Sequence, residues 1–158
     1  MSDDKPRQLT IERLIKAPRE QVFKAWTDPT LVAQWWGPDG VTNPVCELDV
    51  RPGGAIDIVM LAGPELGEMQ GSKWPMSGVF KEVTSPSKLV YLSSAVMDGK
   101  PILECLNTVF FEDQGDQTKL TLQVVVTKAT PEAEGPLAGM FAGWNQSIGK
   151  LVKLLESR

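Results

Sequence analysis

The segment from Thr130 to Glu156 constrains the fold of this chain more than any other part of the sequence. Thr130 can cap a helix, and Pro131 suits the first turn of one. Apolar residues then recur at steps of three and four, which is the spacing of an amphipathic helix: Leu137, Met140, Phe141, Trp144, Ile148, Leu151, Val152 and Leu155. The sequence therefore predicts one long C-terminal helix that buries its apolar face against the rest of the chain.

Several residues are unfavourable inside this predicted helix. Gly135 with Pro136 is expected to kink the helix or to delay its start. Gly139, Gly143 and Gly149 each cost about 1 kcal/mol relative to alanine in a helix interior. One reason to keep these three glycines would be a close approach of the helix backbone to a sheet or to a ligand.

The chain between Gln8 and Thr127 consists mainly of short strand-like runs separated by turn residues. The predicted strands are Gln8–Lys16, Val45–Val50, Ala55–Leu61, Met76–Val83, Lys88–Ser94, Leu103–Phe111 and Lys119–Thr127. In the last run, apolar and polar residues alternate, which indicates one buried face. The regular turn signals, including a bulge or tight turn at Gly53–Gly54, predict an antiparallel meander.

Two short helices are predicted after the first strand. Pro18 suits the first turn of one helix, and Asp28 with Pro29 suits the cap and first turn of the next, which Gly37–Pro38 ends. The resulting order predicts an α+β, helix-grip fold: a seven-stranded antiparallel sheet wrapped around the C-terminal helix. At 158 residues the chain fits a single domain, with residues 1–7 as a flexible tail. A cavity is expected between the sheet and the C-terminal helix.

Composition excludes several classes of function. The chain has 16 basic and 20 acidic residues, a net charge of −4, which argues against nucleic-acid binding. No apolar run reaches the roughly 20 residues that a membrane span needs, and the N-terminus lacks the features of a signal peptide, so a cytoplasmic location is expected.

The chain has no histidine. This excludes Ser-His-Asp and Cys-His catalysis and most zinc and iron sites, so neither a metal nor a cofactor is expected. Cys46 and Cys105 both lie in predicted strands among apolar neighbours. Both are therefore expected to be small buried residues rather than partners in a disulfide.

A dispersed set of residues resembles the START-like helix-grip superfamily, also called SRPBCC. The matching residues are Ala17-Pro18, Val22-Phe23, Ala25–Pro29, Leu31, Trp35–Gly37, Arg51–Gly54, Gly78, Glu82-Val83, Gly139-Met140 and Gly143-Trp144. Within the superfamily, the chain is similar to the branch named after the activator of the heat-shock-protein-ninety ATPase. The resemblance covers about Leu9 to Leu155. It implies a cavity for apolar or amphipathic small molecules, in a family that includes lipid carriers, polyketide cyclases, antibiotic-resistance proteins and co-chaperone domains.

Large apolar residues are the candidates for lining such a cavity. Trp35 and Trp36 form either the mouth of the cavity or part of the core, and Trp74 with Met76 either closes over the cavity or simply starts a strand. The inward face of the last helix supplies further candidates, which serve equally as core residues: Met140, Phe141 and Trp144. Met60 and Met97, with Met140, would give the cavity an adaptable lining.

Four polar residues are candidates for contacts inside the cavity. Asp57, Tyr91 and Asn107 lie within predicted strands, and each would be buried on the concave face or exposed on the other. A buried carboxylate at Asp57 would have a raised pKa suited to acid–base chemistry. Asn145, beside Trp144, either orients a ligand or faces solvent.

Three functions are consistent with these residues. The leading hypothesis is a non-catalytic protein that binds a hydrophobic or aromatic small molecule. The second is a cyclase- or hydrolase-like enzyme that uses a polar cavity residue: Asp57, Asn107 or Tyr91. The third is a co-chaperone-type regulator of a heat-shock protein ATPase, which needs an exposed docking surface. A strand edge beside Trp74 would also allow a homodimer.

Overall fold

The computed structural model describes residues 8–156, apart from the side chains of residues 134–136. The flexible tail predicted for residues 1–7 lies outside the described residues. The elements are β1 (Gln8–Ile15), α1 (Arg19–Thr27), α2 (Pro29–Trp35), β2 (Val41–Leu48), β3 (Ala55–Ala62), the 3₁₀ turn η1 (Pro64–Met69), β4 (Lys73–Thr84), β5 (Lys88–Met97), β6 (Lys100–Asp113), β7 (Thr118–Ala129), the 3₁₀ turn η2 (Pro131–Ala133) and α3 (Glu134–Glu156).

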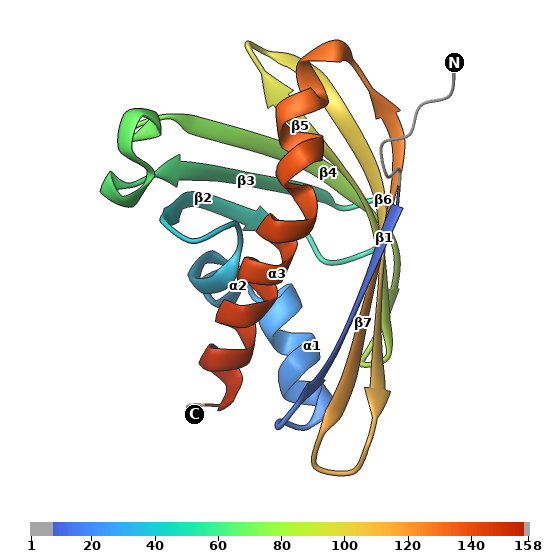
Figure 1. The fold of residues 1–158 in the computed structure, drawn as a ribbon. Helices are drawn as coiled ribbons and strands as arrows, with labels where there is room; N and C mark the ends of the chain where they lie inside the picture. The colour runs from blue at the N-terminus through green and yellow to red at the C-terminus, as the bar shows by residue number, and fades with distance from the viewer. Residues whose placement is uncertain (1–7, 157–158) are drawn as a thin grey trace.

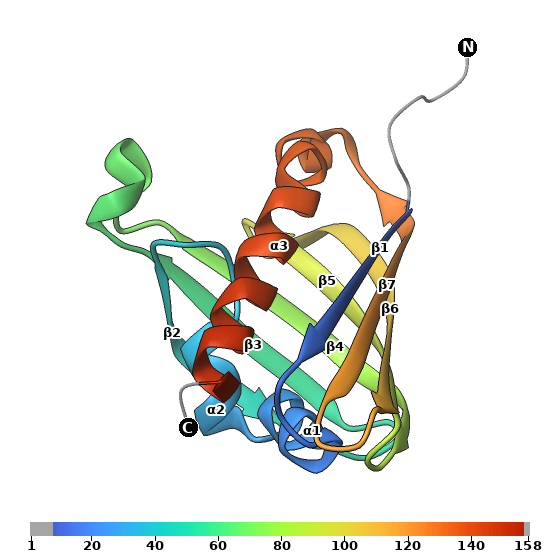
Figure 2. The same cartoon turned by 60° about the horizontal axis from the view of Figure 1, so that its bottom comes forward.

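The strands form one antiparallel sheet in the order β1-β7-β6-β5-β4-β3-β2. The sheet curves around α3, while α1 and α2 lie against one end of its concave side (Figures 1 and 2). The predicted α+β helix-grip fold is therefore confirmed. In the described part of the chain, no helix combines the length and the apolar character needed to cross a membrane.

The junction between α1 and α2 forms as the sequence predicts. The Asp28 side chain accepts a hydrogen bond from the Thr30 backbone N–H at 2.9 Å, and Pro29 occupies the first turn of α2. Gly37, which follows the end of α2, has a φ of 91°, a conformation that favours glycine. A Cβ there would lie 2.6 Å from Met60 Sδ, so the chain passes close to β3 at this point.

Helix α3 is held more firmly at its C-terminal half than at its N-terminal half. In the C-terminal half, Ile148 and Leu151 are fully buried. The Lys150 ammonium donates to Pro38 O at 3.1 Å, and Glu156 accepts from the Lys16 backbone N–H at 3.1 Å. In the N-terminal half, the described residues that pack on the core are only half-buried: Leu137, Met140 and Trp144.

The close approach suggested for the glycines of α3 is not observed. A Cβ built at Gly139, Gly143 or Gly149 would meet no atom within 4 Å beyond the helix's own backbone. The close approach occurs instead inside the sheet, where a Cβ at Gly78 in β4 would collide with the Leu92 backbone carbonyl of β5. Gly78 therefore allows the backbones of β4 and β5 to approach closely at this point.

Alanine substitutions at Gly78 and Gly143 should have opposite effects on stability. Gly78→Ala should lower the free energy of unfolding by about 1–3 kcal/mol, because a rigid backbone atom occupies the space that the methyl group needs. Gly143→Ala should raise it by up to about 1 kcal/mol, since the site is open. Urea denaturation of both variants measures this, and a wild-type midpoint for Gly78→Ala would contradict the steric account.

Candidate functional site

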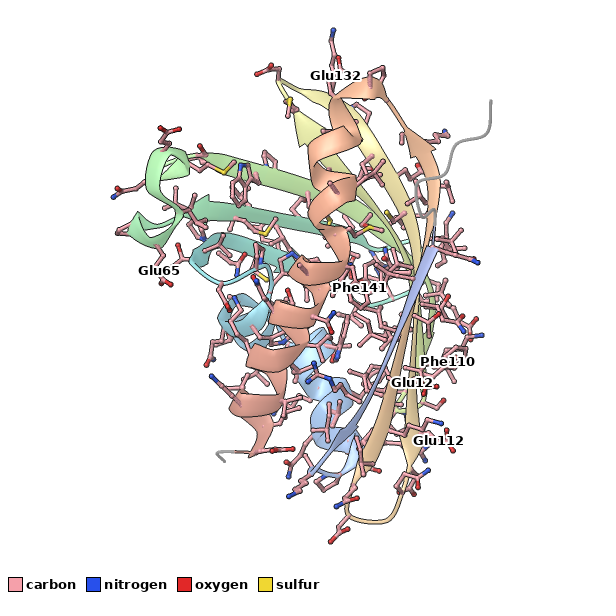
Figure 3. The ribbon with its side chains drawn as sticks, in the orientation of Figure 1. Glu12, Glu65, Phe110, Glu112, Glu132 and Phe141 are labelled. Atoms are coloured by element: carbon pink, nitrogen blue, oxygen red, sulfur yellow. The ribbon has the colours of Figure 1, made fainter. Side chains whose placement is uncertain are left out.

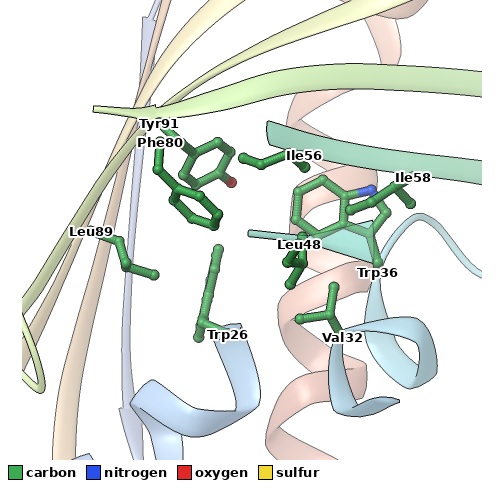
Figure 4. A pocket seen from close by; sticks show the side chains of 9 residues that line it. All are labelled: Trp26, Val32, Trp36, Leu48, Ile56, Ile58, Phe80, Leu89 and Tyr91. Atoms are coloured by element: carbon green, nitrogen blue, oxygen red, sulfur yellow. The ribbon is translucent and has the colours of Figure 1, made fainter. Parts of the chain in front are cut away.

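A small cavity lies between helices α1 and α2 and the β2–β5 half of the sheet (Figure 4). Its wall is formed by Trp26, Val32, Trp36, Leu48, Ile56, Ile58, Phe80, Leu89 and Tyr91. Its volume is about 20 Å³, close to the roughly 10–15 Å³ needed for one water molecule. The cavity therefore has room for about one water molecule, and a larger molecule would need the wall to move outward.

Tryptophans from all three helices pack together at this wall. The Trp26 ring lies 4.7 Å from the Trp35 ring, and it stacks on Trp144 of α3 at 6.1 Å. Trp36 also contacts Trp144, with ring centres 5.4 Å apart. Trp144 thus supports two of the lining residues from behind, although it does not itself line the cavity.

The cavity reaches the polar part of the sheet's concave face at Tyr91. Asn107 pairs with Tyr91 across β5 and β6, and its buried amide donates to Tyr91 O at 3.2 Å and to Ser93 Oγ at 2.9 Å. The Tyr91 ring makes an edge contact with Phe80 at 6.3 Å. These contacts fix the Tyr91 backbone and ring, and Figure 4 shows the hydroxyl group directed among the lining side chains.

The groups on this face that can lose a proton are held neutral. Burial raises the pKa of the Tyr91 hydroxyl above its ordinary value, and Cys105 adds a smaller effect in the same direction. Burial, with a further contribution from Glu104, raises the pKa of the Cys105 thiol to about 11. The lining residues that the structure describes include no carboxylate and no cationic side chain. At neutral pH the cavity wall is therefore uncharged.

The structure brings a few of the predicted site residues together. Trp36 and Tyr91 line the cavity, while Trp144 and Asn107 contact lining residues from behind or beside them. Trp35 is fully buried, and its indole N–H donates to Ala25 O at 2.9 Å. Trp35 therefore joins α2 to α1 as a core residue.

The other candidates lie elsewhere. Met76 is buried in the core, Met60 and Met140 are half-buried, and half-buried Trp74 pairs with Met60 across β3 and β4. Asp57 and Met97 are exposed, while Asn145 donates to Phe141 O within α3. Phe141 is 58% exposed and lies on the side of α3 toward β1 in Figure 3.

The cavity differs from the expected one in its position. Its described lining comes from α1, from α2 and its end, and from β2–β5, with no residue of α3. The burial expected for Phe141, as a lining or core residue, is not found, because most of its side chain is accessible and it is not among the lining residues. At Trp74, β4 pairs only with β3, since its pairing with β5 begins at Met76. A short free edge therefore exists there, and the homodimer stays a prediction.

Sequence reasoning did not single out most of the lining residues. Val32, Leu48, Ile56, Ile58 and Leu89 are aliphatic residues that resemble any others in a core. Trp26 could have been found, because the helix break at Asp28-Pro29 folds α2 back on α1. That break places the Trp26 and Trp35 rings side by side.

Among the side chains that the structure describes, no group of three or more cysteine or acidic residues lies close enough together to hold a metal ion. Cys105 is buried and Cys46 half-buried, and both thiols are free. Burial raises the pKa of the Cys46 thiol to about 11 as well.

Residues 16–156 match the family described as "Activator of Hsp90 ATPase homolog 1-like protein", abbreviated AHSA1. The chain belongs to this family. The resemblance predicted from the dispersed tryptophan, glycine and proline residues is thereby confirmed. The match begins just after β1 and extends over α1, α2, β2–β7 and α3, and so includes every residue that lines the cavity.

Solved structures of bacterial proteins share this fold. A protein from Chromobacterium violaceum is 27% identical, with a TM-score of 0.81, over 96% of this chain and 98% of that one. A protein from Nitrosomonas europaea is also 27% identical, with a TM-score of 0.77, over 95% and 94% of the two chains. An AHSA1 protein from Silicibacter pomeroyi is 25% identical, with a TM-score of 0.75, over 94% and 97%. No curated protein matches the chain.

The ionisation of Tyr91 should make the protein less stable in alkali. Its folded-state pKa is raised above the ordinary 10.0, so its contribution to stability is complete below pH 10 and is lost as the pH rises further. The free energy of unfolding should then fall by up to about 1.4 kcal/mol per pH unit from this group. Urea denaturation at several alkaline pH values should give a shallower decline for Tyr91→Phe.

Tyr91 is the only tyrosine in the chain, so phenolate absorbance reports on this residue alone. The native protein should show no phenolate until well above pH 10, whereas the urea-unfolded chain should titrate normally. Phenolate formation at an ordinary pH in the folded protein would contradict the buried position of the hydroxyl.

Proposed function

We propose that the protein binds a hydrophobic or aromatic small molecule in the cavity between α1, α2 and strands β2–β5. The observation that carries the proposal is the composition of the wall, which is aliphatic or aromatic apart from one hydroxyl and the indole N–H groups. Apolar pockets with a few polar groups are the usual form of small-molecule sites. We further propose that the chain is a single domain that works in the cytoplasm and needs no cofactor.

Binding is favoured over catalysis because the described wall of the cavity contains no charged side chain. General acid–base chemistry needs a group whose pKa lies near the operating pH. Tyr91 and Asn107 do face inward, as the enzyme hypothesis requires, but the pKa of Tyr91 is raised away from neutrality and an amide does not titrate. Asp57, the carboxylate candidate, is exposed.

Binding should be measurable through the tryptophans of the wall. Delipidated protein titrated with indane or naphthalene should change its intrinsic fluorescence, because Trp26 and Trp36 line the cavity. Val32→Phe should weaken binding by about tenfold or more, since the larger side chain fills the space that the ligand needs. Native mass spectrometry of gently purified protein would then identify the natural ligand by its mass.

Val45→Phe is the matched control, because Val45 is 38% exposed on β2 and is not among the lining residues. Circular dichroism and thermal unfolding establish that each variant is folded. Leu48→Phe, at a half-buried position of the wall, replaces Val32→Phe if the latter does not fold. The proposal would be contradicted if a folded wall variant bound the hydrocarbons with wild-type affinity. It would also be contradicted if the wild-type protein bound neither indane nor naphthalene.

A co-chaperone role is the second candidate, favoured by the family and by the outer face of the sheet. Val79, Leu92, Leu106 and Val125 pair in one row across β4–β7. Val125 is 40% exposed, and Phe110 lies on the same outer side (Figure 3). A partly exposed apolar row can serve as a docking surface. A rise in the ATPase rate of Hsp90 on adding the protein, lost in Val125→Lys, would support this role, and an unchanged rate would remove it.

A further inference from the structure

Two polar groups at the cavity have no hydrogen-bond partner within the described part of the chain. These are the Tyr91 hydroxyl and the Trp26 indole N–H, and both residues line the cavity. Their exposed fractions are only 3% and 4%. A buried polar group without a partner costs about 1–3 kcal/mol, so two such groups at one cavity call for an explanation.

The chemistry of these two groups restricts what can complete them. An indole N–H donates a hydrogen bond and cannot accept one, whereas a phenol can do both. Burial raises the pKa of the Tyr91 hydroxyl, so the hydroxyl keeps its proton and remains a donor at neutral pH. The partner that suits both groups is therefore a hydrogen-bond acceptor.

The rest of the wall restricts the charge of that partner. The other lining residues are Val32, Trp36, Leu48, Ile56, Ile58, Phe80 and Leu89. None of these carries a charge that could neutralise a carboxylate, phosphate or ammonium group. Burying an unpaired charge is strongly unfavourable, so a charged ligand does not fit this wall.

We propose that the cavity recognises an uncharged, mainly apolar molecule that carries a hydrogen-bond acceptor such as a ketone or lactone carbonyl, with the Tyr91 hydroxyl as the donor. The inference rests on the proposed binding function and adds the chemical class of the ligand. Asn107 acts as a positioning residue, because its amide holds the backbone of Tyr91 through the 3.2 Å bond to Tyr91 O. Trp26, whose indole N–H has no partner in the described part of the chain, lines the same wall.

The test compares two pairs of probes that differ in one carbonyl group: indane with 1-indanone, and tetralin with 1-tetralone. Each affinity is measured by intrinsic fluorescence for wild-type protein and for Tyr91→Phe. The ratio of ketone affinity to hydrocarbon affinity cancels most of the difference in hydrophobicity within a pair. This ratio should fall by about fivefold or more in Tyr91→Phe, the effect of losing one donor.

Two further measurements separate recognition from a change in the fold. The carbonyl stretch of bound 1-indanone should move to lower frequency in the wild type and return toward its apolar-solvent value in Tyr91→Phe. The variant itself should be at least as thermally stable as the wild type, because it lacks a hydroxyl without a partner.

The outcomes distinguish this inference from the proposed function. If neither hydrocarbon nor ketone binds wild-type protein, the binding function itself fails. If the hydrocarbons bind but the affinity ratio and the carbonyl frequency are the same in both proteins, the inference alone is overturned, and a permanently bound water is then the partner of Tyr91.

Discussion

The aromatic contacts of Trp26 hold the helical part of this protein together. Its ring packs against Trp35 of α2 at 4.7 Å, stacks on Trp144 of α3 at 6.1 Å and meets Phe111 of β6 at 6.3 Å. Each such pair contributes about 0.5–1.5 kcal/mol beyond the apolar area it buries. Because Trp26 also lines the cavity, the wall of the candidate site and the junction of the three helices are the same structure, and neither can change alone.

Most of the fold could be predicted from the sequence, because its signals are local. Alternating apolar and polar residues and regular turn signals indicated the strands. Asp28-Pro29 located the junction of the short helices. Two strands begin earlier than predicted, and in each a proline lies near the start of the strand. Strand β2 begins at Val41, before Pro44, and its register shifts between Thr42 and Val45. Strand β4 begins at Lys73 and includes Pro75 at a position that pairs only with β3.

The candidate site was harder to predict than the fold, because its residues come from α1, from α2 and its end, and from β2–β5, and most of them resemble ordinary core residues. Tyr91 was one of the predicted candidates. It lies two residues from buried Leu89 along β5, so the two side chains share one face of the strand. For Phe141, by contrast, the sequence pattern suggested a burial that the structure does not show. Its spacing fits the apolar stripe of α3, yet the stripe is wider than the surface that the sheet covers, so 58% of Phe141 stays accessible.

The polar groups at the cavity make sense as a compromise between stability and binding. A phenylalanine at position 91 would fill nearly the same space without leaving a hydroxyl unpaired, so the tyrosine lowers the stability of the ligand-free protein. Residues that break a local rule in this way are expected at functional sites. A ligand that supplies the acceptor would recover this free energy and stabilise the folded state further in proportion to its concentration. The same hydroxyl would then weaken the ligand-free fold and select the ligand.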